Sequence, residues 1–127
     1  MSELAHFANL DGAEFMVLTT YRRSGDAVPT TVWFAAVGER VYLTTQIQAG
    51  KLKRIRATPR VTVAPSDRVG VLSGPAASGQ ARVLDPDEAG VAEAALRAKY
   101  GEQYTILIKQ LPGIAQRVFI EVTSAGA

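Results

Sequence analysis

Hydrophobic and polar positions along the chain indicate five β-strands: all five stretches contain residues that favour strands, and residues 60–64 and 117–122 also alternate with a period of two. The stretches are residues 14–21, 27–37, 40–46, 60–64 and 117–122. Ser24-Gly25-Asp26 provides a turn between the first two stretches, and Gly38-Glu39 provides a tight connection to the third. Residues 14–46 are therefore predicted to form a three-stranded meander.

Further β-structure is predicted on either side of the middle of the chain. The strand at 60–64 should end where Pro65-Ser66-Asp67 breaks the alternation. Residues 69–84 continue as β-structure that Gly74-Pro75 interrupts, with 80–84 the clearest part. Six or so strands with few helices predict a mainly β fold with flanking helices, closed as an antiparallel barrel rather than an open parallel sheet.

Spacings of three and four residues between apolar positions predict four helices. They cover residues 2–9, 49–57, 85–100 and 103–111. Ser2 should cap the first helix, and Pro59 should end the second because the residue before a proline resists helix.

The third helix has the strongest boundary signals. Asp85-Pro86-Asp87-Glu88 supplies a capping residue, a proline and acidic residues in the first turn, and Gly101 can close the other end. Its buried stripe is predicted to consist of Val91, Ala95, Leu96 and Ala98.

Length and composition set the broad class. The 127 residues, 47% of them hydrophobic, suit one domain over residues 1–127 with a continuous core. The absence of cysteine excludes disulfides, thiolate-bound zinc and cysteine nucleophiles, and it suits a reducing compartment. No apolar run approaches the ~20 residues that cross a bilayer, and the first residues lack a signal pattern, so we expect a cytoplasmic protein without membrane contact.

The charge of the chain is small but unevenly placed. A net charge of +2 does not by itself imply nucleic acid. The segment from Arg40 to Ser66, however, contains six cations and no acid. Nucleic acid is not expected there, because no aromatic residue lies between Tyr42 and Tyr100 to stack on bases. This basic segment suits a smaller anion.

Hydrolytic and metal chemistry find little support. His6 is the only histidine, and a catalytic triad or metal site needs partners that the sequence does not offer. The sequence has no glycine-rich phosphate loop of the Walker or dinucleotide type. The carboxylates near Asp85 are explained by the helix start, so no metal site is predicted.

The basic helix at 49–57 is a candidate phosphate site. Lys51 and Arg54 are three residues apart and so lie side by side, at a helix start where cations oppose the helix dipole. A bound anion would ease that placement. Hydroxyl and amide groups end the strand just upstream, at Thr44, Thr45 and Gln46. An ordinary solvated basic face explains the composition equally well.

The second strand offers a possible wall for a planar ring. Residues Thr30, Thr31, Val32 and Trp33 combine hydroxyls, an apolar surface and backbone amides. The alternative is an ordinary strand with core residues on one face and hydroxyls on the other.

Three segments together resemble the pyridoxamine-phosphate-oxidase-like split β-barrels, and most closely the deazaflavin-dependent oxidoreductases of type B. They are LTTYRRSGDAVPTTVWF, VYLTTQ and AGKLKRIRATPRVTVAPSD, within residues 10–84, with the last strand matching more loosely. The most specific element is K-x-K-R-x-R-x-x-P-R, from Lys51 to Arg60.

The resemblance implies a six-stranded split barrel of the FMN-binding type that forms a homodimer with its cofactor site at the subunit interface. The implied cofactor is coenzyme F420, a deazaflavin, with FMN as the alternative. The implied cofactor-binding residues are Thr30, Thr31, Val32, Trp33, Thr44, Thr45, Gln46, Lys51, Lys53 and Arg54. Pro29 and Gly50-Lys51 stand where pyridoxamine phosphate oxidases have an arginine and an Arg-Lys pair, which argues against that reaction.

The implied activity is hydride transfer from the reduced cofactor to a small unsaturated or quinone-like substrate. No catalytic residue is assigned; Tyr21, Tyr42, Tyr104 or solvent can supply a proton. An FMN protein and a cofactor-storage module without catalysis remain alternatives.

Overall fold

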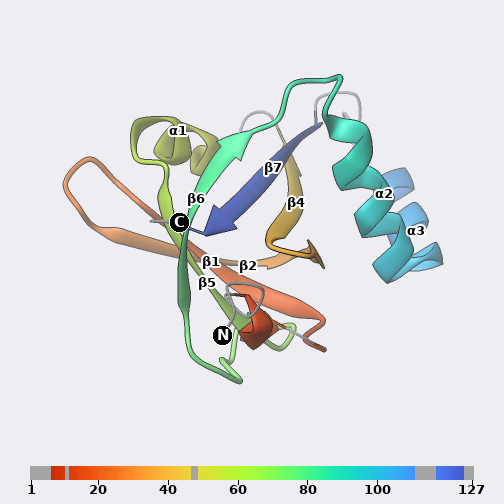
Figure 1. Cartoon of the computed structure of the whole chain (residues 1–127), viewed down its shortest axis with the longest axis horizontal. Helices are drawn as coiled ribbons and strands as arrows, with labels where there is room; N and C mark the ends of the chain where they lie inside the picture. Colours follow the sequence, from red (N-terminus) through yellow and green to blue (C-terminus); the bar gives the residue numbers. More distant parts are fainter. Residues whose placement is uncertain (1–6, 11, 47–48, 111–116, 125–127) are drawn as a thin grey trace.

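The computed structural model describes residues 7–10, 12–46, 49–110 and 117–124. Seven strands form one antiparallel sheet in the order β2-β1-β5-β6-β7-β4-β3 (Figure 1). The strands are β1 (Phe15–Tyr21), β2 (Ala27–Trp33), β3 (Ala35–Val37), β4 (Arg40–Gln46), β5 (Arg60–Ser66), β6 (Ala77–Val83) and β7 (Arg117–Ser124). The helices are η2 (Ala8–Leu10), α1 (Gly50–Ala57), α2 (Ala89–Tyr100) and α3 (Glu102–Gln110).

The two edges of this sheet are consecutive in the chain. β2 and β3 lie at opposite edges, yet only Phe34 separates them, so the sheet curls back on itself (Figure 1). The mainly β, antiparallel fold is thereby confirmed, and the curl is consistent with a split barrel. The strand count is seven rather than six, because the predicted single strand at 27–37 is broken at Phe34.

The break at Phe34 has a tertiary cause. The Phe34 N–H donates to the Tyr100 hydroxyl at 2.9 Å, and the same hydroxyl lies 2.9 Å from the Phe34 carbonyl oxygen. Because the hydrogen-bonding groups of Phe34 face α2, the residue leaves the strand ladder. The predicted meander is therefore two hairpins: β1 pairs with β2, and β3 pairs with β4.

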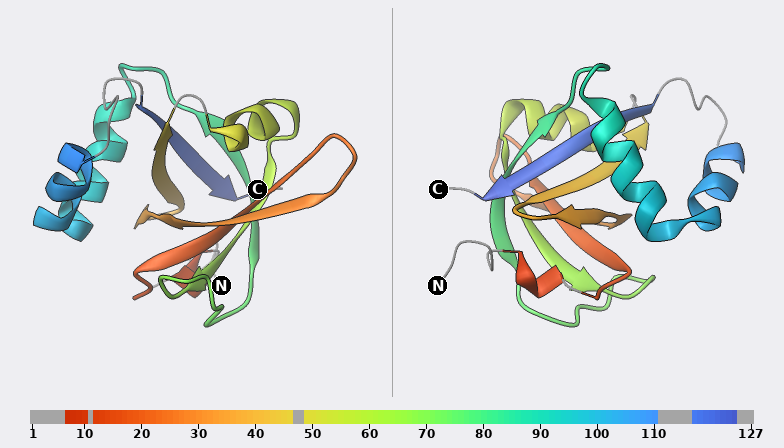
Figure 2. Two further views of the ribbon diagram at one scale, coloured as in Figure 1. Left: turned by 180° about the vertical axis from the view of Figure 1, so that it is seen from behind. Right: turned by 45° about the vertical axis from the view of Figure 1, so that its right-hand side comes forward.

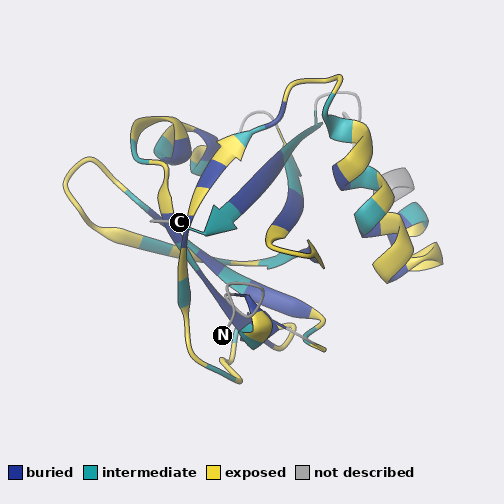
Figure 3. Cartoon of the chain, in the orientation of Figure 1, coloured by how far each residue is buried: buried dark blue, intermediate teal, exposed yellow. Residues whose placement is uncertain are grey.

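The main core fills the inside of the curl (Figure 3). α1 closes one end of it by burying Leu52 and Ile55, the two residues whose spacing predicted this helix. The predicted alternation in β5 is also confirmed, since Val61 and Val63 are both fully buried in this core.

α2 and α3 pack together against one side of the curled sheet (Figure 2). The buried residues of α2 are Ala92, Leu96 and Tyr100, which recur every four residues. The predicted stripe is wrong at two positions, because Val91 is 60% exposed and Ala98 is exposed as well. α3 confirms the short helix predicted at 103–111, apart from Leu111, which is outside the described residues.

The predicted start of α2 at residue 85 is also wrong. Residues 85–88 form a turn in which the Glu88 N–H donates to the Asp85 carbonyl oxygen at 2.9 Å, and α2 begins at Ala89. The Glu88 carboxylate accepts two hydrogen bonds from Arg82 on β6, which tie this turn to the sheet. These bonds, followed by one from the Asp85 N–H, lower the pKa of Glu88.

β5 runs two residues further than predicted. Pro65 and Ser66 both pair with β1, although the sequence indicated a break there. The proline is tolerated because β6 pairs only with residues 60–63, so no β6 residue needs an N–H from Pro65. The Pro65 carbonyl oxygen still accepts from the Ser73 N–H at 2.9 Å. Most of the helix predicted at 2–9 lies outside the described residues. No described helix has the length and apolar character needed to span a membrane.

Candidate functional site

α1 begins directly where β4 ends. The Ala49 N–H donates to the Gln46 carbonyl oxygen at 3.0 Å, so three residues separate the last position of β4 from the start of the helix. Ala49 precedes α1 without making a side-chain cap. Since Leu52 and Ile55 face the core, the cations at 51 and 54 lie at the boundary between core and solvent.

Lys51 and Arg54 form a pair of cations near the start of α1. Both are half-buried, and neither forms an ion pair with a carboxylate in the described part of the chain. Burial and then the charge of Arg54 lower the pKa of Lys51. Both causes disfavour the charged amine, and an anion placed between the two cations would oppose both.

Arg54 also reaches the sheet. Its Nε donates to the Thr20 Oγ1 of β1 at 2.6 Å, and Thr20 is only 1% exposed. Lys53, predicted as a helper in the same site, is exposed on α1. The structure thus brings Lys51 and Arg54 together and leaves Lys53 in solvent.

The residues at the end of β4 take different roles. The Thr44 hydroxyl donates to the Val118 carbonyl oxygen at 2.9 Å, so it can offer a ligand only an acceptor. Thr45 alternates with the buried Val41 and Leu43 and therefore faces the core side of the sheet. Gln46 is exposed beside the start of α1.

The four predicted residues of β2 lie on two faces of the strand. Val32 packs against the main core, and Thr30 donates from the same face to the Leu18 carbonyl oxygen at 3.4 Å. Thr31 and Trp33 point outward and line a pocket of about 350 Å³ with Phe15 and Arg68.

A ligand that touches Thr30 and Val32 on one face of β2 and also the outward-facing Thr31 or Trp33 must pass around the edge of the strand. This is possible because β2 is an edge strand, whose second side has no strand partner among the described residues. Thr31 lies three residues beyond Val28, the strand partner of Thr20, which is about 10 Å along a strand. The predicted residues therefore lie on two faces of the sheet rather than in one enclosed cavity.

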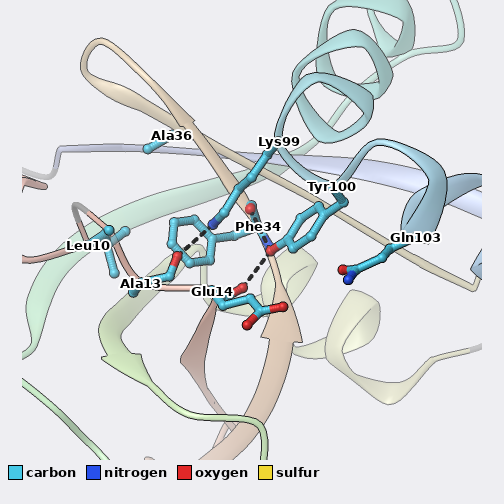
Figure 4. Close-up of a pocket in the computed structure, with 9 residues that line it drawn as sticks. Leu10, Ala13, Glu14, Phe34, Ala36, Lys99, Tyr100 and Gln103 are labelled. Atoms are coloured by element: carbon cyan, nitrogen blue, oxygen red, sulfur yellow. Dashed lines mark hydrogen bonds between the residues drawn. The ribbon is translucent and has the colours of Figure 1, made fainter.

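A larger pocket of about 520 Å³, which was not predicted from the sequence, lies near Phe34 (Figure 4). The Lys99 Nζ sits 3.3 Å from the centroid of the Phe34 ring and donates to the Ala13 carbonyl oxygen at 2.8 Å. Burial lowers the pKa of Lys99 to about 8, against a smaller opposite effect of Glu14.

Tyr100 lines the same pocket. Its hydroxyl lies 2.6 Å from the Glu14 carbonyl oxygen, and burial raises its pKa to about 12. The ring of Trp33 stacks at 4.3 Å on that of Tyr100, which links this pocket to the outer face of β2. The residues of this pocket come from three distant segments, so no local motif could reveal it.

The tyrosines predicted as possible proton donors are mostly engaged. The Tyr42 hydroxyl donates to the buried carboxylate of Glu121 at 3.3 Å. Tyr104 is fully buried and accepts from Arg117 at 3.2 Å, and burial raises its pKa. Tyr21 is half-buried beneath the guanidinium of Arg60. Within the described ranges, no group of three His, Cys, Asp or Glu side chains is placed to hold a metal ion.

Comparison with known proteins places the chain in a family. The family described as pyridoxamine 5'-phosphate oxidase matches residues 3–127, and the chain belongs to this family. This confirms the superfamily to which the sequence was similar. No curated protein sequence matches the chain.

Solved structures with this fold have different ligands in their names. One, an F420 reductase, is 23% identical, with 91% of this chain and 90% of that chain covered and a TM-score of 0.61. A FAD-binding protein of Mesorhizobium loti is 16% identical over 98% of this chain and 90% of that one, with a TM-score of 0.71. The heme storage protein HutZ of Vibrio cholerae is 13% identical, with coverages of 95% and 88% and a TM-score of 0.70. At these identities the likeness is one of fold.

Proposed function

We propose that this chain is an oxidoreductase that binds a phosphate-bearing ring cofactor, coenzyme F420 in the first place, along the free edge of β2. Lys51 and Arg54 would hold the phosphate, with Gln46 beside them. Thr31, Trp33 and the backbone of β2 would flank the ring. The bound deazaflavin would supply hydride transfer to a small unsaturated or quinone-like substrate.

One observation carries this proposal: two neighbouring, half-buried cations have no carboxylate partner among the described residues. Cations on an ordinary solvated face are exposed, as Lys53 and Arg56 are. A partly desolvated cation pair without a counter-ion is instead suited to an anionic ligand, which would form charge-assisted hydrogen bonds with both.

Two features favour the deazaflavin over FMN. Its lactyl-oligoglutamate tail carries more negative charge, and the exposed Lys53 and Arg56 extend the basic surface of α1 beyond the proposed phosphate position. In addition, Pro29 and Gly50 stand where the oxidases of this superfamily have arginines, which argues against tight FMN binding by their route.

The contribution of the chain itself would be binding, orientation and exclusion of water. The described tyrosines offer no free buried proton donor at β2, so solvent would supply the proton. The resemblance also implies a homodimer that completes each site from a second subunit. Light scattering on the purified protein tests that state.

Fluorescence quenching with deazaflavin and FMN tests the binding site. Lys51→Ala should weaken deazaflavin binding by ~1.5–3 kcal/mol, the scale of a charge-assisted hydrogen bond. Arg23→Ala is the matched control, because it removes one positive charge from an exposed turn. Equal affinity in Lys51→Ala and the wild type would show that the phosphate site is misplaced.

Catalysis is tested separately from binding. Reduced deazaflavin offered with a panel of enones and quinones should be oxidised faster with the protein than without it. Tight binding without turnover of any substrate would favour the storage alternative, and preferential FMN binding would favour a flavin protein.

A further inference from the structure

The Arg54 side chain is folded back over the start of its own helix. A Cβ built on Gly50 would lie only 3.0 Å from Arg54 Nη1, so the guanidinium occupies the space that a side chain at residue 50 would fill. The Arg54 guanidinium therefore lies about one helical turn N-terminal to the Arg54 Cα, at the end of the helix that contains Lys51.

Thr20 holds this guanidinium from the sheet. Its hydroxyl is directed toward the Val28 carbonyl oxygen at 3.5 Å, so its oxygen is free to accept from Arg54 Nε at 2.6 Å. A threonine orients the guanidinium without neutralising it, which a carboxylate at the same place would do. The two Nη groups form no hydrogen bond with a described side chain and remain available for a ligand.

We propose that Thr20 and the missing side chain of Gly50 are positioning elements that set the Arg54 guanidinium beside the Lys51 amine, so that both cations bind one phosphate group. This inference rests on the proposed function, since it specifies how that site recognises phosphate.

The charges of Lys51 and Arg54 suit a site that binds a doubly charged anion such as phosphate. Arg54 lies close enough to Lys51 to lower the pKa of its amine, so the pair is repulsive by itself. A repulsive pair held together by a buried hydroxyl and by the space that Gly50 leaves open is pre-organised, which spares a ligand the ordering of a long arginine side chain.

The test compares ligands that differ only in phosphate, namely FMN and riboflavin. Thr20→Val keeps the side-chain volume but removes the acceptor, and it should weaken FMN binding about tenfold or more while changing riboflavin binding less than about twofold. Thr20→Ser retains the hydroxyl and should restore the preference for FMN. A purely structural role of Thr20 would weaken both ligands alike.

Gly50→Ala provides a second, independent test of the positioning role. The added methyl group must displace the flexible end of Arg54, whereas alanine favours the helix over glycine. The melting temperature should therefore stay unchanged or rise, while the preference for FMN over riboflavin falls. Inorganic phosphate alone should raise the melting temperature of the wild type, and this rise should be smaller in Gly50→Ala and Thr20→Val. This measurement does not depend on binding of the flavin ring.

The outcomes separate the two hypotheses. If Lys51→Ala lowers the preference for FMN but Thr20→Val and Gly50→Ala leave it unchanged, the positioning role is wrong and the phosphate site stands. If the wild type binds FMN and riboflavin equally and inorganic phosphate causes no shift, the phosphate site itself is refuted and the positioning role with it.

Discussion

The Tyr100 hydroxyl is expected to be a main determinant of stability, because it satisfies the backbone of Phe34 where the sheet changes direction. Tyr100→Phe removes this hydroxyl and leaves the Phe34 N–H, a buried donor, without its partner. The Glu14 carbonyl oxygen loses a donor as well, but Glu14 is exposed and water can replace that bond. An orphaned buried donor costs about 2 kcal/mol.

This magnitude converts to a measurable change in melting temperature. The entropy of unfolding is about 2.1 cal/mol/K per residue, or about 0.27 kcal/mol/K for this chain, so Tyr100→Phe should melt about 7 °C lower. Urea unfolding should show a lower midpoint with an unchanged slope. Hydrogen exchange should accelerate at the Phe34 amide in particular.

The pH dependence provides a second check on the same residue. Burial raises the Tyr100 pKa from 10.0 to about 12, so the folded state retains its proton after the unfolded state has lost it. This effect destabilises the wild type as the pH rises from 10 toward 12, and Tyr100→Phe should lack that part of the decline. Tyr21→Phe, which removes a hydroxyl from a half-buried ring, is the control. A free energy of unfolding within about 0.5 kcal/mol of the wild type would refute the assigned role of Tyr100.

Two further predictions concern the surroundings of β2. Gly70 has a φ of +92° and an added Cβ would lie 2.7 Å from Thr31 Oγ1, so Gly70→Ala should destabilise the chain and displace Thr31. Gly25→Ala, at a φ of +95° in open space, measures the backbone strain alone. An equal loss of stability in Gly70→Ala and Gly25→Ala would exclude a contribution from the Thr31 contact. Burial lowers the pKa of Lys99 to about 8, below its unfolded value of 10.5, so this residue should make stability rise with pH through that interval. The free energy of unfolding, measured from pH 7 to 10, should rise less steeply in Lys99→Met than in the wild type. An identical slope in the two proteins would contradict the burial of that amine.

The sequence predicted the parts of the fold that depend on local pattern. β4 occupies the predicted residues, and α1 begins within one residue of its prediction, because strand-forming residues, turn residues and a following proline act locally. The break at Phe34 was missed because AVPTTVWFAAV contains no glycine or proline at that point. The bend comes from Tyr100, which is 66 residues away in the chain.

The same distinction applies to the candidate site. Lys51 and Arg54 were predicted to be neighbours because helical spacing alone brings them together. Thr20 could not be found that way, since its contact with Arg54 spans 34 residues. The start of α2 was predicted four residues too early, because residues 85–88 form a turn closed by the bond from the Glu88 N–H to the Asp85 carbonyl oxygen, and α2 follows it at Ala89.

The position of β7 has a consequence for how the protein is made. β7 lies between β6 and β4, so residues 117–124 join two parts of the sheet that are otherwise separate at that seam. During synthesis, more than half of the described chain must be made after β4 before β7, its main strand partner, exists. Val41 therefore stays without its partner Val122 until the end of the chain is made. Such late, long-range pairing slows folding and prolongs the exposure of strand edges. We therefore expect the nascent chain to depend on chaperones or low temperature for good yield, more than its small size would indicate.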